Sequence, residues 1–150
     1  MGDLEIRAAV AEDVPAIVAM LADDPLGAQR ESQDDLTPYL AALERLSADP
    51  NQHLVVAVRE GRVVGTLQLT VIPGLSRKGA TRSIIEGVRI HADERGSGLG
   101  TQLIEWAIDE SRRLDCQLVQ LTSDVTRTDA HRFYERLGFT ASHVGFKLPL

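Results

Sequence analysis

Three glycines and one arginine gather in a short stretch of this 150-residue chain. Gly96, Gly98 and Gly100 directly precede a helix-forming run, and Arg95 stands before them. A strand-like run of Ile and Val, residues 84–90, comes before the turn. In such a strand, turn and helix, backbone N–H groups and the positive end of the helix dipole converge on one point, which suits a phosphate group. The segment therefore predicts a ligand that carries a pyrophosphate.

The spacing of these glycines separates the known pyrophosphate motifs. The dinucleotide motif G-x-G-x-x-G fails, because Thr101 or Leu103 stands where its third glycine is needed, counting from Gly96 or Gly98. The nucleoside triphosphate loop fails as well, because no Gly-Lys-Ser or Gly-Lys-Thr occurs in the chain. What is present is R-x-x-G-x-G over residues 95–100.

A second motif lies further along, in the run D-A-H-R-F-Y-E-R-L-G-F of residues 129–139. Ala130, Phe133 and Leu137 fall on one helical face, and Gly138 is placed to end the helix in a left-handed conformation. This block resembles the A-x-x-x-Y-x-x-x-G-F motif of the GCN5-related N-acetyltransferases (the GNAT superfamily), and the glycine turn resembles the loop with which that family holds acetyl-coenzyme A. Two motifs in the family's order make the resemblance specific.

The resemblance implies a mixed α/β fold and an enzyme that transfers an acetyl group from acetyl-coenzyme A to a primary amine. The amine would attack the thioester directly in a ternary complex, and a small-molecule acceptor is favoured over a protein because the second motif is most similar to the bacterial small-molecule branch. The resemblance covers nearly the whole chain, apart from roughly residues 23–35 and the last ten. A non-catalytic acyl-coenzyme A sensor is the second hypothesis. Retention of Glu86 and Tyr134 counts against it.

The resemblance also implies which residues hold the coenzyme. Amides of a strand segment would bond the pantetheine and thioester, the glycine turn would hold the pyrophosphate, and Arg127 or Arg132 would replace a phosphate contact that relatives make with an asparagine three residues before Ala130. The alternative for both arginines is an ordinary surface position. The strand segment and turn residues are Val88, Arg89, Ile90, Arg95, Gly96, Ser97, Gly98, Leu99, Gly100 and Thr101.

Three side chains are candidates for proton transfer. Glu86 interrupts an apolar strand, where a carboxylate is costly unless it faces a wet cleft, so it is either a general base or a solvent-facing strand residue. Asp124 follows the next predicted strand and either shares the base role or binds a cationic acceptor, or else serves as a turn residue. Tyr134 matches the tyrosine with which the family protonates the leaving thiolate, and Phe133 is expected in the core.

Composition limits the class of protein. Hydrophobic residues make up 43% and charged residues 25% of the chain, which is ordinary for one soluble domain spanning residues 1–150. No apolar run reaches the ~20 residues of a membrane helix, and the start of the chain is acidic, so we expect a cytoplasmic protein without membrane contact. The single cysteine, Cys116, excludes an internal disulfide, and the scattered histidines predict no metal.

The net charge of −6 argues against nucleic acid as a partner and weakly favours a cationic acceptor. Homodimerisation through residues 144–148 is possible, because an edge strand there has the pattern of an interface.

Local patterns predict a mixed, mostly antiparallel sheet flanked by helices. A break is expected at residues 23–27, a hairpin turn at 60–61 and a basic loop at 75–80. The expected strands are residues 4–8, 53–59, 62–72, 84–90, 118–122 and 139–148, and the expected helices are 11–22, 34–46, 99–113 and 129–137.

Overall fold

A computed structural model describes residues 2–150. The chain divides into two compact units, of which the first ends at Gln120 and the second is Leu121–Leu150. The first unit holds β1 (Leu4–Ala8), the short 3-10 helix η1 (Ala11–Asp13), α1 (Val14–Ala22), α2 (Pro25–Arg30), α3 (Thr37–Ala48), β2 (Gln52–Arg59), β3 (Arg62–Ile72), α4 (Ser76–Gly79), β4 (Arg82–Ile90), the 3-10 helix η2 (Ala92–Glu94), α5 (Leu99–Arg113) and most of β5 (Leu118–Leu121). The second unit holds α6 (Thr128–Arg136).

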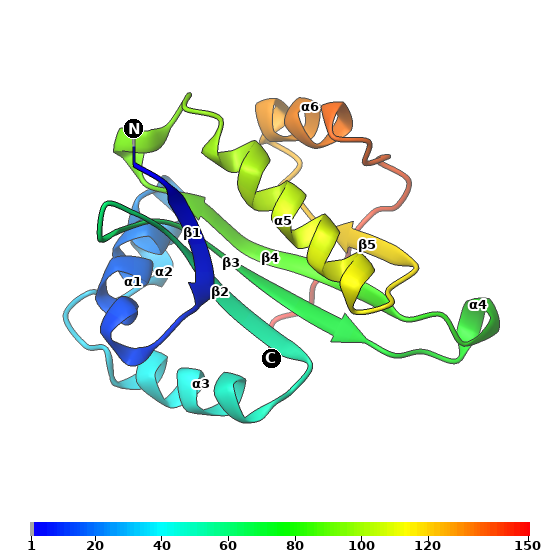
Figure 1. Cartoon of the computed structure of the whole chain (residues 1–150), viewed down its shortest axis with the longest axis horizontal. Coiled ribbons are helices and arrows are strands. Elements are labelled where there is room, and N and C mark those ends of the chain that lie inside the picture. Colours follow the sequence, from blue (N-terminus) through cyan, green and yellow to red (C-terminus); the bar gives the residue numbers. More distant parts are fainter. Residues whose placement is uncertain (1) are drawn as a thin grey trace. The chain divides into compact units, whose positions relative to one another are not determined.

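The strands form one sheet in the order β1-β2-β3-β4-β5 (Figure 1). The pairs β1–β2, β2–β3 and β3–β4 are antiparallel, and α5 provides the crossover between β4 and β5. The hairpin between β2 and β3 turns at Glu60 and Gly61, which both have positive φ, as two-residue hairpin turns require. The predicted mixed α/β architecture is confirmed.

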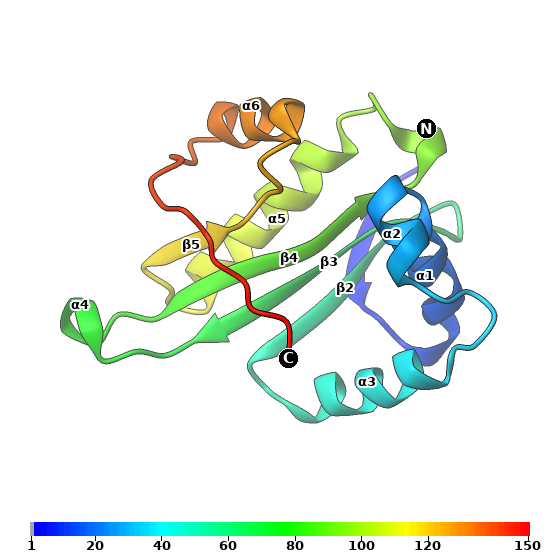
Figure 2. The same cartoon turned by 180° about the vertical axis from the view of Figure 1, so that it is seen from behind.

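Helices cover both faces of this sheet. Helix α5 packs on β3 and β4 from one side, and α1 packs on the same strands from the other (Figures 1 and 2). Alternation along β3 explains this, because successive strand residues point to opposite faces and both sets are buried here. The apolar core comprises Val14, Ile17, Val18, Met20, Val55, Val56, Ala57, Val64, Leu67, Leu69, Ile85, Leu99, Leu103, Ile104 and Ala107.

A buried hydrogen-bond chain joins α5 to β4. The Ser111 hydroxyl donates to the carbonyl of Ala107 at 2.7 Å, and the hydroxyls of Ser83 and Ser111 lie 2.7 Å apart. Since the Ser111 proton is used on Ala107, Ser83 is the donor to Ser111. Ser83 therefore faces α5, which places the odd-numbered residues at the start of β4 on the α5 side of the sheet.

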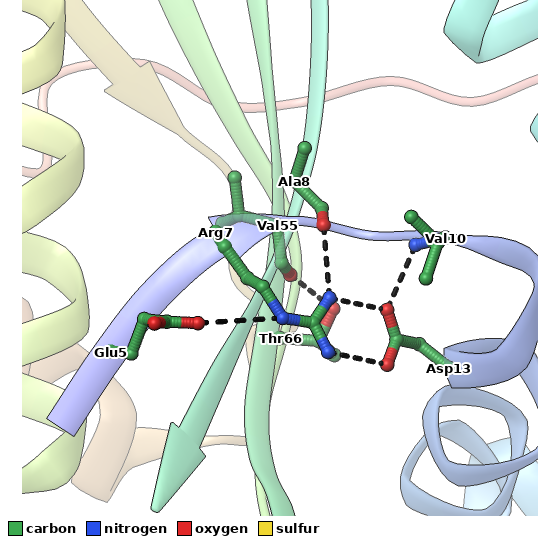
Figure 3. A network of polar contacts seen from close by, with 7 residues as sticks. All are labelled: Glu5, Arg7, Ala8, Val10, Asp13, Val55 and Thr66. Atoms are coloured by element: carbon green, nitrogen blue, oxygen red, sulfur yellow. Dashed lines mark hydrogen bonds and ion pairs between the residues drawn. The ribbon is translucent and has the colours of Figure 1, made fainter.

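An ion pair fixes the chain between β1 and α1 (Figure 3). Both outer nitrogens of the Arg7 guanidinium donate to the Asp13 carboxylate, at 2.8 and 3.0 Å. The backbone N–H of Val10 donates to the same carboxylate at 2.8 Å. These bonds hold the pKa of Asp13 below its ordinary value, and the bonds from Arg7 contribute most to the lowering. In the same view the buried Thr66 hydroxyl donates to the Val55 carbonyl at 2.8 Å.

The second unit contains the predicted helix over residues 128–136. Its end is closed by two backbone bonds, from Phe139 N–H to the Tyr134 carbonyl at 3.1 Å and from Gly138 N–H to the Glu135 carbonyl at 3.0 Å. Gly138 has φ of +98°, so the predicted left-handed end of this helix is confirmed.

The predicted break at residues 23–27 is confirmed, because α1 ends at Ala22. Helix α2 was not predicted: it begins in the same segment because the Asp24 carboxylate caps it by accepting from Gly27 N–H at 2.6 Å and Pro25 suits the first helical position. Two other local predictions were wrong. The expected loop at residues 75–80 contains the single turn α4, in which Arg77 and Lys78 are left-handed. The expected strand at 139–148 is absent, because residues 139–150 have no regular secondary structure.

Candidate active site

A β-bulge directly after Glu86 in β4 determines which later residues of the strand share its face. Glu86 lies opposite Gln68 of β3 and Arg89 lies opposite Thr66, so β4 holds two residues where β3 holds only Leu67. Gly87 supplies the left-handed conformation that such a bulge needs, with φ of +62°. Because paired residues share a face, Glu86 and Arg89 lie on the same face although they are three residues apart. That is the face opposite α5.

Beyond the bulge, no strand in the described part of the chain is paired with one edge of β4. Gln117 N–H donates to the Thr81 carbonyl at 2.8 Å, so β5 begins beside the start of β4, and its four residues accompany only the first half of that strand. His91 N–H donates to the Val64 carbonyl of β3 at 2.8 Å, so the N–H of Ile90 points to the opposite, free edge. The same alternation aims the N–H of Arg89 at β3. An extended ligand can therefore pair with this edge as a strand would.

The glycine turn leads directly from this edge to the start of α5. Gly96 and Gly98 have φ of +80° and +85°, which only glycine adopts without strain. Gly98 is the N-cap of α5 and no side chain caps the helix there, so the N–H groups of its first turn are available to an anion. Leu99 is buried and anchors that turn in the core. The Ser97 hydroxyl, in contrast, donates to the Glu94 carbonyl at 2.6 Å.

Ion pairs hold the segment before the turn in place. Glu94 accepts from Arg59 of β2 at 2.6 Å, and these side chains are only 19% and 13% exposed. Arg95 reaches Asp23 after α1 at 3.3 Å, on the exposed surface. A buried, charge-assisted pair such as Arg59–Glu94 restrains backbone far more than an exposed one does. The turn is therefore preorganised by residues that sequence reasoning missed.

Asp24 links the α1–α2 corner to the strand with the bulge. Its carboxylate lies 3.4 Å from Arg89 Nε and also caps α2 through Gly27. The Gly27 bond, and then the positive charge of Arg89, lower the pKa of Asp24. The corner thus stands on the same sheet face as Glu86. The Asp-Pro pair was the sequence signal for this element, because it is a helix-start pattern.

A hollow of about 580 Å³ lies beside this corner, between α1 and the start of β3. Two of its lining residues adjoin the predicted site: His91, which follows Ile90, and Asp23, the partner of Arg95. Small side chains of α1 form much of its wall. The lining residues are Ala16, Ala19, Met20, Ala22, Asp23, Gln33, Arg62, Val63 and His91.

In the second unit, Asp124 has the bonds of a turn residue. Its carboxylate accepts from the Thr126 hydroxyl at 2.6 Å and from the Thr126 N–H at 2.9 Å. These bonds lower the pKa of Asp124, with smaller contributions from Arg127 and Lys147. A carboxylate with a lowered pKa is a weaker proton acceptor.

Tyr134 stands in an aromatic cluster of the second unit. Its ring centroid lies 5.1 Å from Phe133 and 5.9 Å from Phe139, both edge to face. Arg132 forms an ion pair with Asp129 one helical turn away, and Arg127 is the exposed N-cap residue of α6. Within the first unit, in contrast, the bulge brings Glu86, Arg89 and the free amide edge together.

Among residues 2–150, no group of three His, Cys, Asp or Glu side chains has the arrangement of metal ligands. No helix in this described part of the chain is long and apolar enough to cross a membrane.

Comparison with known proteins bears directly on this geometry. Residues 15–139 match the model of the acetyltransferase (GNAT) family, a span that includes both the glycine turn and the block around Tyr134. The chain belongs to the GNAT acetyltransferase family. It is accordingly an acyltransferase of the GNAT fold, as the two motifs predict.

Individual relatives agree with this GNAT assignment. The aminoalkylphosphonate N-acetyltransferase of Salmonella typhimurium is 32% identical over 146 residues, which are 97% of this chain and 91% of that protein. The glucosamine 6-phosphate N-acetyltransferase of Trypanosoma brucei brucei is 37% identical over 90 residues, or 60% and 59% of the two chains. A crystal structure from Bacillus halodurans, named a transcriptional regulator, superposes with a TM-score of 0.95 at 44% identity and covers 99% of this chain and 100% of its own.

GNAT enzymes use acetyl-coenzyme A, and the residues present fit that group. The uncapped start of α5 at Gly98 suits the pyrophosphate, and the free edge of β4 at Ile90 suits an extended arm with amide groups. At Gly96 and Gly98 an added Cβ would meet no protein atom within 4 Å, so the glycines serve the backbone conformation and an approach from outside, not internal packing.

Proposed function

We propose that this GNAT protein transfers the acetyl group of acetyl-coenzyme A to the primary amine of a small molecule, by direct attack in a ternary complex. The observation that carries the proposal is the position of Glu86 on the sheet face opposite α5, directly before the bulge at Gly87 and beside a free amide edge. The acetyl donor would lie along that edge and the amine would approach across that face. When bound, acetyl-coenzyme A supplies an activated thioester carbonyl.

The proposal gives each cofactor-binding residue a role. The strand segment Val88–Ile90 would hold the pantetheine and thioester, and backbone donors aimed at a developing oxyanion typically contribute ~3 kcal/mol each. The glycine turn, from Arg95 through Gly96, Ser97, Gly98, Leu99 and Gly100 to Thr101, would hold the pyrophosphate. Arg127 and Arg132 would add charge-assisted bonds to phosphate.

Proton transfer falls to three side chains in this proposal. Glu86 would take a proton from the attacking ammonium, directly or through water, because a free amine has a pKa of ~10 and must lose that proton to attack. Asp124 is the second candidate for this base, or for binding a cationic acceptor. Tyr134 would return a proton to the departing thiolate. All of residues 1–150 would act as one transferase domain.

The acceptor in this proposal carries a primary amine. The Salmonella and Trypanosoma relatives are named for small amines that bear a phosphonate or a phosphate group, which supports a small molecule over a protein. The net charge of −6 argues against nucleic acid as the acceptor and weakly favours the cationic ammonium group of an amine. The reaction would take place in the cytoplasm, where acyl-coenzyme A thioesters are available.

The first test is the thermal melt of the purified protein with acetyl-coenzyme A, NADH or ATP, each at about a hundred times its expected dissociation constant. Linkage predicts ~2.7 kcal/mol of stabilisation for the true ligand, or roughly 5–10 °C at this chain length. Thiol release from acetyl-coenzyme A is then followed with aminoethylphosphonate, glucosamine 6-phosphate and n-butylamine. A shift with a nucleotide alone, or no amine-dependent thiol release, would refute the proposal.

Variants test the proton-transfer roles separately. Glu86→Gln is expected to lower kcat 10²- to 10⁴-fold at neutral pH and to flatten its rise with pH. Asp124→Asn tests the second candidate for the base and is expected to have only a small effect. Tyr134→Phe should lower kcat without changing the KM for the amine. Full activity of Glu86→Gln with an unchanged pH profile would transfer the base role to Asp124 or to bulk water.

A second candidate function is regulation of a partner by acyl-coenzyme A binding without turnover. The observation that favours it is the name of the Bacillus halodurans structure, a transcriptional regulator 44% identical to this chain. The melt and the thiol-release assay together distinguish the transferase from the regulator. A regulator would show the melt shift with acetyl-coenzyme A but no amine-dependent thiol release.

The proposal includes a homodimer formed through the end of the chain. Residues 144, 146, 148 and 150 are Val, Phe, Leu and Leu, and all are largely exposed, Phe146 to 93%. Alternating apolar residues are the pattern of a strand, although residues 139–150 form none within one chain. A second copy would supply the missing partner. Light scattering should give about twice 16.4 kDa, and Phe146→Asp should give the monomer mass. A monomeric wild-type protein would contradict this.

A further inference from the structure

A row of polar side chains crosses the sheet face that carries Glu86. Gln68 lies directly opposite Glu86, and Thr70 lies two residues further along β3, so both share its face. Gln52 of β2 lies opposite Thr70 and belongs to the same face. All three are partly exposed, whereas Leu67 and Leu69, which alternate with Gln68 and Thr70 in β3, are fully buried. The face of β3 that carries Gln68 and Thr70 is therefore polar at this point and continues to Glu86 on β4.

Hydrogen bonds fix the orientation of both amides in this row. Gln52 Oε1 accepts from Gln68 Nε2 and from the Thr70 hydroxyl, each at 2.8 Å. Because Gln68 directs its amide nitrogen toward Gln52, its carbonyl oxygen Oε1 lies on the other side of the planar amide. Because Gln52 directs its oxygen toward β3, its Nε2 remains to donate elsewhere. The row thus offers an oxygen acceptor near Glu86 and an N–H donor at its far end.

These two groups match the two ends of one kind of molecule. An ammonium has three N–H donors, and the carboxylate of Glu86 with Gln68 Oε1 would accept two of them. Gln68 Nε2 and Gln52 Oε1 are only 2.8 Å apart, so Gln68 Oε1 and Gln52 Nε2, at the outer ends of the two joined amides, are separated by roughly two hydrogen-bond lengths. Gln52 Nε2 would therefore meet a ligand group roughly 5 Å from the ammonium nitrogen bound at Gln68. A donor N–H requires an oxygen acceptor at that point.

We infer that Gln68, Thr70 and Gln52 form the acceptor subsite, and that it takes a primary amine carrying an oxygen acceptor, such as a hydroxyl, carbonyl or oxyanion, a few bonds from the nitrogen. The inference rests on the proposed transferase function and names the substrate class of the same site. Gln68 binds the ammonium, Gln52 binds the oxygen, and Thr70 holds Gln52 in orientation.

The test compares two acceptors by their KM values: aminoethylphosphonate, which has both groups, and n-butylamine, which has only the amine. Gln68→Leu should raise both KM values roughly tenfold, because a hydrogen bond to a charged group is lost. Gln52→Leu should raise only the KM for aminoethylphosphonate, several-fold. Gln117→Leu is the matched control, since its side-chain oxygen bonds the Thr81 N–H at the start of β4, away from Glu86. The KM for acetyl-coenzyme A should stay unchanged throughout.

Thr70→Val distinguishes the loss of the subsite from a folding defect in the two glutamine variants. It keeps the side-chain volume, removes only the hydroxyl that holds Gln52, and should raise the KM for aminoethylphosphonate about threefold with an unchanged melt. Equal KM values for both amines in wild type and in all three variants would overturn the subsite while the transferase function stands. A wild-type protein that releases thiol with neither amine, nor with glucosamine 6-phosphate, would overturn both.

Discussion

At the residue scale, Asp13 shows how one carboxylate joins two elements. It is 6% exposed and accepts two bonds from Arg7 of β1 and one from the Val10 N–H before α1. Removing the charge would leave the Arg7 guanidinium without its principal partner in a part-buried place. Such an unpaired charge costs more than the net contribution of the pair itself.

Asp13→Asn is therefore expected to lower the free energy of unfolding by about 2 kcal/mol at pH 7. The folded-state pKa of Asp13 is lowered, so this stabilisation is present above the unfolded value of ~3.9 and is lost as pH falls through the folded value. Urea unfolding at pH 7 and pH 3 measures the loss of unfolding free energy and its dependence on pH. Glu5→Gln is the control, because Glu5 is 69% exposed and 3.5 Å from Arg7, and an equal loss in the two variants would contradict the argument.

At the element scale, the position of α5 depends on the Ser83–Ser111 hydrogen-bond chain. Ser111 is both the donor to Ala107 and the acceptor from Ser83. Ser111→Ala should cost about 1–3 kcal/mol, because it leaves the buried Ser83 hydroxyl without an acceptor. Ser83→Ala should cost less, because Ser111 keeps its bond to Ala107. Denaturant titration of both single variants and the double variant checks this order, and a costlier Ser83→Ala would refute it.

The start of α5 supports a functional prediction at the same scale. Gly98→Ala forces a side chain into a left-handed conformation, at a cost of about 1–2 kcal/mol, and would disturb the N–H groups aimed at the pyrophosphate. The KM for acetyl-coenzyme A should rise about tenfold. Gly61→Ala imposes similar strain, with φ of +76°, in the β2–β3 hairpin. The Gly61→Ala variant should lose comparable stability with no change in the KM for acetyl-coenzyme A. An equal rise of that KM in both variants would contradict the assignment of the α5 start to the pyrophosphate.

At the scale of the whole molecule, several carboxylates have lowered folded pKa values because hydrogen bonds favour their charged forms. A hydrogen bond from Arg113 lowers the pKa of Glu110, and the Gly27 N–H does the same for Asp24. The bonds from Arg7 lower the pKa of Asp13. The native state then binds fewer protons than the unfolded state near pH 4, so stability falls as pH falls. Burial raises the pKa of the Cys116 thiol, and a raised pKa gives the opposite sign, a loss of stability as pH rises above the unfolded value of ~8.5.

The urea midpoint should therefore be nearly constant from about pH 5 to pH 8, fall steadily from pH 5 to pH 3, and fall slightly above pH 9. Chemical denaturation across this range measures it at fixed ionic strength. Cys116→Ser isolates the alkaline part of this profile, because it removes the part-buried thiol. A midpoint that rises on acidification would contradict the carboxylate argument.

The sequence by itself determined the order of the five strands and of the longer helices between them, and the position of the glycine turn. Both depend on interactions between residues close in the chain: alternation in β2 and β3, the 3.6-residue period of α5, and glycines where φ must be positive. The left-handed end of α6 at Gly138 was predictable for the same reason. The two motifs carried the family assignment, and both lie within the matched residues 15–139.

Only the tertiary structure decided which residues share the face of Glu86. The bulge at Gly87 changes the face of every later residue in β4, and no local pattern marks a bulge whose partner strand is far along the chain. The bonds of Gln68 to Gln52 and of Arg59 to Glu94 span 16 and 35 residues, so their partners could not be chosen from the sequence. The strand predicted at residues 139–148 was wrong for the same physical reason, because β structure needs a partner and alternation alone cannot provide one.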